Sequence, residues 1–216
     1  MTISPPARHY DYDRSGGSIY DKSFATIRAE IDTRRLPADA EKVAVRMVHA
    51  CGQVDLVDDL EIHPDLVAAA RNALASGAAI LTDAHMVASG VTRARLPKDN
   101  DVVCLLRDER VPALARSWGT TRSAAAVSLW ADRLDGAVVA IGNAPTALFH
   151  LLETVLDGGP RPAAVIGVPV GFIGSAESKR ALAQLEPAIP YLVVHGRRGG
   201  SAMAAAAVNA LSQEEE

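Results

Sequence analysis

The chain has 216 residues, of which 49% are hydrophobic and 22% are charged, with a formal net charge of −4. This composition supports one hydrophobic core and excludes an intrinsically disordered chain. The acidic balance argues against nucleic acid as a partner, because proteins that bind nucleic acids usually carry a basic face. The sequence contains no apolar run of about 18 residues for a membrane span and no signal-peptide pattern at its start, so we expect a cytoplasmic protein that does not enter a membrane.

The first part of the chain is predicted to be helical. Phe24, Ile27 and Ile31 recur at helical spacing and predict a helix over 23–31. The same rhythm predicts a helix over 40–50 that ends at Gly52, and a third helix over 64–75.

After residue 77, short apolar runs alternate with helical patterns. The runs predicted to be strands lie at 78–81, 101–106, 137–142, 163–168 and 191–195, and the predicted helices at 122–133, 145–156, 176–185 and 201–211. Apolar strands joined by helices are typical of a parallel sheet that is covered on both faces. We therefore expect an α/β fold, namely a three-layer doubly wound domain with a mainly parallel sheet of about five strands and an N-terminal helical region. The whole chain, 1–216, is predicted to form a single domain with frayed ends at 1–12 and 212–216.

Ligands of such folds bind beyond the carboxyl ends of the strands, so the loops there are the first candidates for a site. Asn143 follows one predicted strand and precedes a helix with Pro145 in its first turn, where free backbone amides favour an anion. A plain turn with Asn143 as the helix cap is the alternative. Arg197 and Arg198 follow the last strand and are candidates for anion binding or for solvated surface positions. Arg122, at a predicted helix start, is a third candidate cation.

Histidine is the residue type that titrates near neutral pH, and the chain has six of them. Among these, His49 alone lies in the middle of a predicted apolar helix face. The alternative is a histidine that serves only the core or the surface. Cys51, two positions further on, points elsewhere on a helix, which weakens a Cys–His nucleophile.

Several chemistries lack their basic parts in this sequence. It has no P-loop, no dinucleotide fingerprint, no G-x-S-x-G serine elbow and no cluster with metal-ligand spacing. Its two cysteines, Cys51 and Cys104, form no C-x-x-C pair and are expected to be buried, reduced thiols. The residues by themselves predict a doubly wound, cytoplasmic enzyme that acts on a small molecule.

Seven blocks of the sequence, in order, resemble the precorrin-8X methylmutase family from about Tyr10 to Leu211. They are IYDKSFATIRAE at 19–30, AVRMVHACG at 44–52, GVTRARLP at 90–97, TRSAAA at 121–126, AIGNAPTALF at 140–149, PVGFIGSAESK at 169–179 and GGSAMAAAAVNAL at 199–211.

The resemblance implies a homodimeric isomerase that converts precorrin-8X to hydrogenobyrinic acid by a methyl shift from C11 to C12, without a metal or redox cofactor. The catalytic histidine of the family falls on His49 and a substrate-contacting serine on Ser23. We expect Ser23 to orient the substrate, because it stands near a predicted helix start with no histidine close in sequence. Arg122, Asn143, Arg197, Arg198 and Lys179 are the expected anchors for the carboxylates of the tetrapyrrole.

The chain departs from the family pattern at His85, where an acidic residue would be unsurprising, and at His195, where relatives often carry arginine. Two other functions stay open at this point. One is a cobalt-precorrin-8 methylmutase, which shares the fold and the chemistry. The other is a corrinoid carrier that binds without turnover.

Overall fold

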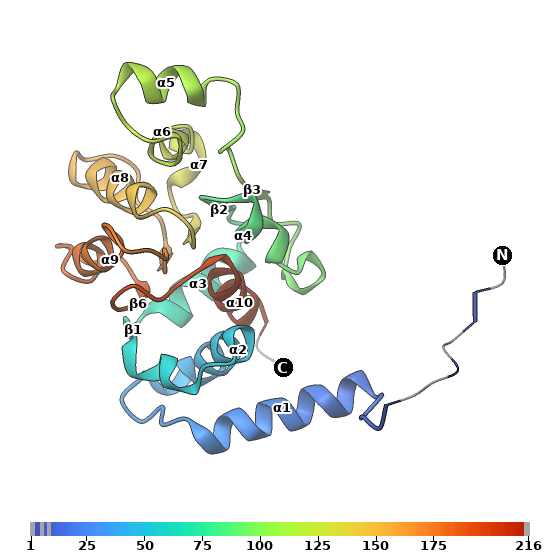
Figure 1. Ribbon diagram of the computed structural model, residues 1–216. Coiled ribbons are helices and arrows are strands. Elements are labelled where there is room, and N and C mark those ends of the chain that lie inside the picture. The colour runs from blue at the N-terminus through green and yellow to red at the C-terminus, as the bar shows by residue number, and fades with distance from the viewer. Residues whose placement is uncertain (1–2, 5–6, 8–9, 214–216) are drawn as a thin grey trace.

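The computed structural model describes residues 3–4, 7 and 10–213 (Figure 1). Of the ends predicted to be frayed, residues 1–2, 5–6, 8–9 and 214–216 lie outside the described residues. None of the helices in the described ranges is long and apolar enough to cross a bilayer.

Six strands form one sheet in the order β1-β6-β5-β4-β2-β3. All neighbouring strands are parallel except β1 and β6, which pair antiparallel with Leu60 opposite Val194. The strand bounds are β1 Leu60–Ile62, β2 Ile80–Thr82, β3 Val102–Val103, β4 Val138–Ile141, β5 Ala164–Gly167 and β6 Tyr191–Val194. The five predicted strands are confirmed, and β1 is the one that sequence reasoning missed.

Ten α-helices surround the sheet in the described part of the chain. Their bounds are α1 Gly16–Glu30, α2 Glu41–Cys51, α3 Leu66–Ala75, α4 His85–Gly90, α5 Val111–Ser117, α6 Arg122–Ser128, α7 Ala131–Leu134, α8 Pro145–Leu156, α9 Ser175–Ala183 and α10 Ser201–Leu211. Short 3₁₀ turns span Ala38–Ala40, Val54–Asp59 and Arg93–Arg95.

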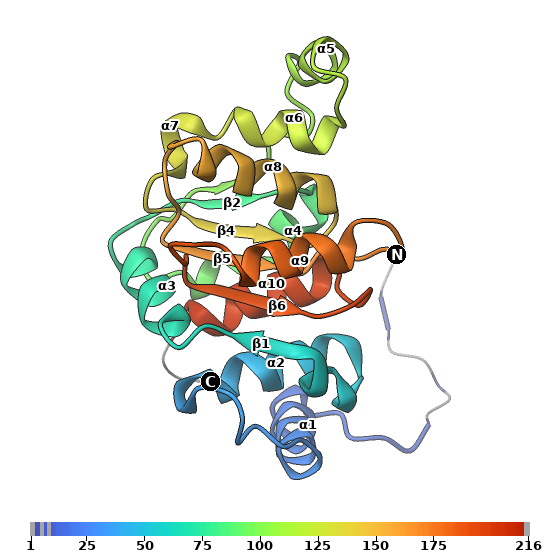
Figure 2. The same cartoon turned by 90° about the vertical axis from the view of Figure 1, so that its left-hand side faces the viewer.

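The strands bury both faces, as the continuous apolar runs predicted. Val138 and Ala140 of β4 pack into one core with α1 to α4 and α10, whereas Val139 and Ile141 pack into a second core with α6 to α9. Alternate residues of a strand point to opposite faces, so the sheet is the middle of three layers. Figure 2 shows α8 and α9 on the near face of the sheet. The predicted three-layer doubly wound fold is confirmed.

Two helices differ from their predicted bounds for local reasons. α1 begins seven residues before the predicted start, because the Ser15 hydroxyl accepts a hydrogen bond from the Ser18 N–H and caps a first turn of two glycines. The helix predicted over 122–133 ends at Ser128 and resumes as α7. Trp130 lies at this break with its side chain buried in the second core.

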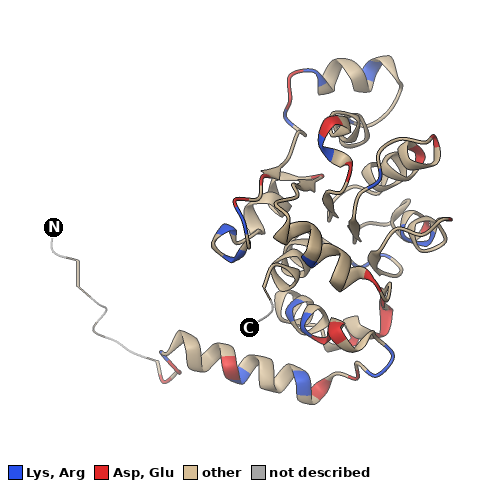
Figure 3. Ribbon diagram, turned by 180° about the vertical axis from the view of Figure 1, so that it is seen from behind, with Lys and Arg blue, Asp and Glu red and all other residues tan. Residues whose placement is uncertain are grey.

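Charged residues are mixed in sign along the outside of the fold. Figure 3 shows acidic and basic positions interspersed along α1 and in the loops, while the central strands are mostly uncharged. This distribution agrees with the net charge and gives the chain local cations rather than a basic face.

A candidate site at the carboxyl edge of the sheet

The loops that follow β4, β5 and β6 meet at the carboxyl edge of the sheet. The Gly200 N–H donates to the Val168 carbonyl at 2.9 Å, and the Gly171 N–H donates to the Arg197 carbonyl at 3.2 Å. A Cβ at Gly142 would lie only 2.9 Å from the Cα of Ser201, so glycine is needed where the first loop meets the start of α10.

A buried carboxylate already occupies the start of α8. Asp83, directly after β2 and 2% exposed, accepts hydrogen bonds from the backbone N–H groups of Gly142, Asn143 and Ala144 at 2.7–3.0 Å. Burial raises the pKa of the Asp83 carboxyl, and the three N–H groups partly offset this rise. The anion expected at this helix start is therefore the protein's own. The helix cap is Ala144 and not Asn143, whose side chain is exposed.

Lys179, expected to anchor a carboxylate, holds the loop after β6 instead. Its side chain is fully buried, and its Nζ donates to the carbonyl oxygens of Gly196, at 3.1 Å, and Arg198. Ser175, one turn earlier on α9, donates to the Pro169 and Gly196 carbonyls at 2.9 and 3.3 Å. These two side chains tie the loop after β5 to the loop after β6, so we remove Lys179 from the expected anchors.

Arg197 and Arg198 lie together on one wall of a pocket of about 420 Å³. Gln53, Phe172 and Met203 also line it. Arg198 donates to Asp55 at 2.9 Å and lies 3.0 Å from Asp59, so the two acids balance most of its charge. Arg197 is exposed and extends over the ring of Phe172 at 5.2 Å. Of the two arginines, Arg197 has the charge available for an anionic ligand.

His49 forms a pair with Ser23 that sequence distance concealed. The Ser23 hydroxyl lies 3.0 Å from His49 Nδ1, and the imidazole packs edge-on against Phe24 and Tyr20, with ring centroids 5.1 and 5.9 Å apart. Ser23 is in the middle of α1 and His49 is in the last turn of α2. The expectation that Ser23 stands near a helix start is wrong. No histidine is close to Ser23 in sequence, as expected, but the fold brings His49 within hydrogen-bond distance.

His49 is also exposed, although a place within an apolar helix face was expected. The apolar face of α2, with Val45 and Val48, turns into the core and leaves the imidazole at its rim beside α1. The imidazole therefore lies against apolar side chains and is accessible to a ligand.

Arg122 lies at the opposite end of the molecule from this pair. It starts α6, is exposed, and its guanidinium donates to the Leu106 carbonyl at 3.3 Å. Figure 1 shows α5 and α6 at the top and α1 and α2 at the bottom, with the sheet between them. One chain does not bring Arg122 to His49.

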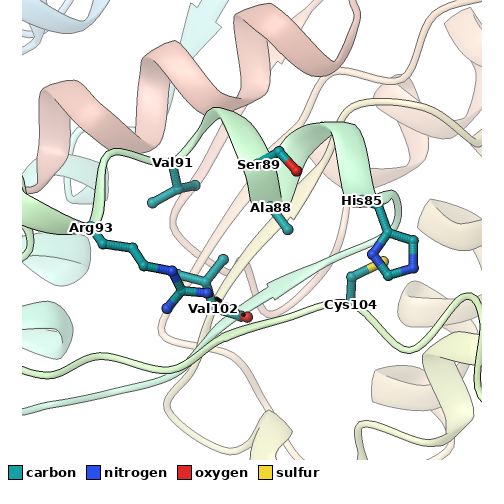
Figure 4. Close-up of a pocket in the computed structure, with 7 residues that line it drawn as sticks. All are labelled: His85, Ala88, Ser89, Val91, Arg93, Val102 and Cys104. Carbon is teal, nitrogen blue, oxygen red and sulfur yellow. Dashed lines mark hydrogen bonds between the residues drawn. The ribbon is translucent and has the colours of Figure 1, made fainter.

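A second pocket, of about 510 Å³, lies beside α4 and β3. Figure 4 shows the His85 ring beside the Cys104 sulfur, with Arg93 on the other side of the space. His85 Nε2 is buried and has no hydrogen-bond partner within the described part of the chain. Burial raises the pKa of the Cys104 thiol. Cys51 and Cys104 are free thiols but only partly buried, contrary to the expected full burial.

His195 belongs to the edge of the sheet. Its Nε2 lies 2.5 Å from Glu61, which also accepts a hydrogen bond from the Tyr191 hydroxyl. Burial raises the pKa of Glu61, but the hydrogen bonds from Tyr191 and His195 outweigh it and lower the pKa. This cluster joins β1 to β6.

Among the described residues, no group of three or more His, Cys, Asp or Glu side chains is arranged to hold a metal ion.

The fold and these side chains define a class: a doubly wound α/β protein with arginines in a pocket at the carboxyl edge of its sheet and an accessible histidine–serine pair. Comparison with known proteins narrows it. The family model described as precorrin-8X methylmutase matches residues 18–214. The precorrin-8X methylmutase of Pseudomonas aeruginosa is 61% identical over 95% of this chain and 99% of its own length.

Two further relatives show the range of similarity. The cobalt-precorrin-8 methylmutase of Salmonella typhimurium is 40% identical over 79% of this chain and 80% of its own. The crystal structure of the precorrin-8X methylmutase from Thermus thermophilus superposes with a TM-score of 0.82 at 39% identity, covering 91% of this chain and 94% of that one. The chain belongs to the precorrin-8X methylmutase family of isomerases of cobalamin biosynthesis.

The burial of Lys179 predicts a pH dependence of folding stability. Desolvation lowers the pKa of Lys179 from 10.5 to about 8. Between these two values the folded chain has released a proton that the unfolded chain still holds, so the free energy of unfolding should rise with pH. We expect the stability of the wild type relative to Lys179→Met to increase between about pH 8 and pH 10.5 in urea titrations. A difference that is constant or falls over this window would contradict the assignment.

Proposed function

We propose that this chain catalyses the methyl shift from C11 to C12 that converts precorrin-8X to hydrogenobyrinic acid. The observation that carries the proposal is the His49–Ser23 pair, an accessible imidazole set against aromatic rings, in a chain of this family. A rearrangement needs no nucleophile and no leaving group, so one proton donor is a sufficient catalytic group. We expect the enzyme to act in the cytoplasm.

His49 is proposed to donate a proton reversibly to the conjugated macrocycle. Protonation makes the ring system poor in electrons, the C11–methyl bond breaks as the C12–methyl bond forms, and the proton returns to the imidazole when the product is released. The reaction is then a net isomerisation. The Ser23 hydroxyl occupies Nδ1, so Nε2 is the ring nitrogen left to carry the transferred proton. Ser23 acts in this scheme by holding the imidazole and orienting the substrate.

The carboxylates of the substrate are proposed to bind at the carboxyl edge of the sheet. Arg197 is the main cation there, while Arg198, balanced by Asp55 and Asp59, supports the same wall and directs its remaining N–H groups to the ligand. Asn143 contributes its exposed side-chain amide, since its backbone N–H is held by Asp83. Binding and catalysis are thus assigned to different side chains.

We propose a homodimer in which Arg122 of one chain completes the site of the other. The support is geometric, because α6 and the α1–α2 pair lie at opposite ends of one molecule. Two copies related by a two-fold axis perpendicular to the line that joins these ends would place α6 of one chain beside the α1–α2 pair of its partner.

The natural substrate is proposed to lack cobalt. The relative named for precorrin-8X shares 61% of its residues with this chain, against 40% for the relative named for cobalt-precorrin-8.

Purified protein should convert metal-free precorrin-8X, with the absorption spectrum changing to that of hydrogenobyrinic acid.

The His49→Ala variant should bind the corrinoid but lose about 10²- to 10⁴-fold in turnover, since general acids typically contribute this much. Ser23→Ala should retain more activity than His49→Ala, because it removes only the hydroxyl that holds the imidazole and orients the substrate.

Thr26→Ala is the matched control for Ser23→Ala, because the Thr26 hydroxyl donates to the Lys22 carbonyl of its own helix. A parallel assay with cobalt-precorrin-8 distinguishes the two substrates. Near-normal turnover in His49→Ala at saturating substrate would contradict proton donation by His49. Binding of precorrin-8X without any spectral conversion by the wild type would instead indicate a carrier.

The shared site predicts complementation between two inactive variants. Mixed and refolded together, His49→Ala and Arg122→Ala chains should regain about a quarter of wild-type activity, because half of the dimers are mixed and each has one intact site. Light scattering gives the oligomeric state of the same samples. No recovery of activity in a verified mixed dimer, or a fully active monomer, would refute the shared site.

A further inference from the structure

The loop between β5 and α9 presents large apolar side chains to solvent. Phe172 is 86% exposed and Ile173 is 91% exposed, and Val170 beside them is 46% exposed. Single exposed apolar residues are common on protein surfaces, but a contiguous group beside a pocket marks a binding surface. We name Val170, Phe172 and Ile173 the apolar loop.

The loop is fixed by its neighbours at both ends. The Gly171 N–H donates to the Arg197 carbonyl, and the Ser175 hydroxyl donates to the Pro169 carbonyl at 2.9 Å. Gly174, at φ 76°, turns the chain into α9 in a conformation that favours glycine. The apolar side chains are therefore displayed by a held backbone.

A cation accompanies the apolar loop. The Arg197 guanidinium lies 5.2 Å from the centroid of the Phe172 ring, within the range of a cation–π contact. Phe172 and Val170 also line the pocket of about 420 Å³ that contains Arg197 and Arg198. An apolar surface thus borders directly on a positively charged wall.

The pocket extends from this surface to the segment that follows α2. Gln53, which lines it, is the second residue after the end of α2 and lies four positions beyond His49. The Val54–Asp59 turn then carries Asp55 to Arg198. The apolar loop and His49 therefore both lie near the C-terminal end of α2.

We propose that the apolar loop is the platform for the face of the tetrapyrrole macrocycle, with Phe172 stacked on the conjugated ring and Ile173 packed beside it. This inference rests on the proposed function and adds residues to its site. A conjugated macrocycle fringed with carboxylates needs apolar contact for its face and cations for its rim. The apolar loop with Arg197 offers these two chemistries side by side.

Binding of hydrogenobyrinic acid, followed by its absorption spectrum, tests the platform directly. Phe172→Ala should raise the dissociation constant about tenfold, as expected for the loss of one aromatic stacking contact. The dissociation constant of Phe172→Trp should stay within about twofold of the wild-type value. Ile173→Ala should weaken binding by a smaller factor. Leu156→Ala is the matched control, since Leu156 is 65% exposed at the end of α8 and lines none of the pockets described above.

Salt separates apolar from ionic contributions. The loss in Phe172→Ala should persist in about 0.5 M salt, whereas the loss in Arg197→Gln should shrink as the charges are screened. With precorrin-8X, Phe172→Ala should raise KM more than it lowers kcat.

Two results would overturn the platform. One is unchanged affinity for hydrogenobyrinic acid in Phe172→Ala. The other is dissociation of a wild-type dimer into monomers by the same substitution, which would assign the surface to a second copy of the chain. Failure of the wild type to convert precorrin-8X is a separate result that defeats the proposed function, because binding of hydrogenobyrinic acid is measured independently of turnover.

Discussion

The carboxylate of Asp83, held by three backbone N–H groups, is the contact on which the arrangement of the candidate site depends. It joins the end of β2 to the start of α8 and closes the helix terminus that would otherwise attract an external anion. It thereby holds Gly142 in position, and Gly142 admits the start of α10 at a distance that no larger residue allows. A single buried acid thus sets how closely the loops of the carboxyl edge approach each other.

The charges at this edge are mostly balanced within the protein. Lys179 donates to loop carbonyls, Arg198 faces Asp55 and Asp59, and Asp83 is satisfied by amides. Such buried or paired groups fix loop positions, because removing one partner leaves the other unsatisfied. In the proposed site, Arg197 and Arg122 of a partner chain bind the carboxylates of the ligand. The motif residues of the family therefore divide into those that build the edge and those that can meet a ligand.

Sequence periodicity predicted the fold well where elements are long or fully buried. The strands of the sheet interior and the helices α8 and α10 have the predicted positions, because continuous apolar runs and helical repeats report burial directly. β1 was not predicted, because its three residues, with Glu61 in the middle, form neither a continuous apolar run nor a helical repeat. The break before α7 escaped because tertiary burial of Trp130 overrides the local helical preference.

The candidate site was predictable only in part. The helical pattern makes His49 a candidate, and the family resemblance adds Ser23 and assigns a role to both. Their contact joins two helices across 26 positions of sequence and has no local signal. Asp83 did have a signal, since an acid directly after an apolar strand lies at the carboxyl edge where free amides gather. The side-chain partners of Lys179 and Arg198 are set by packing between loops, which one sequence does not encode in any spacing. The platform residues Phe172 and Ile173 became visible only through their exposure.

Proton donation from the His49–Ser23 pair is the central claim, and a solvent isotope effect on a single turnover tests it most directly. With enzyme in excess over metal-free precorrin-8X, the rate of hydrogenobyrinic acid formation is measured in H₂O and D₂O at matched protonation states. The account predicts a slower shift in D₂O for the wild type and loss of that difference in His49→Ala. An unchanged single-turnover rate in His49→Ala, with the macrocycle fully bound, would contradict it.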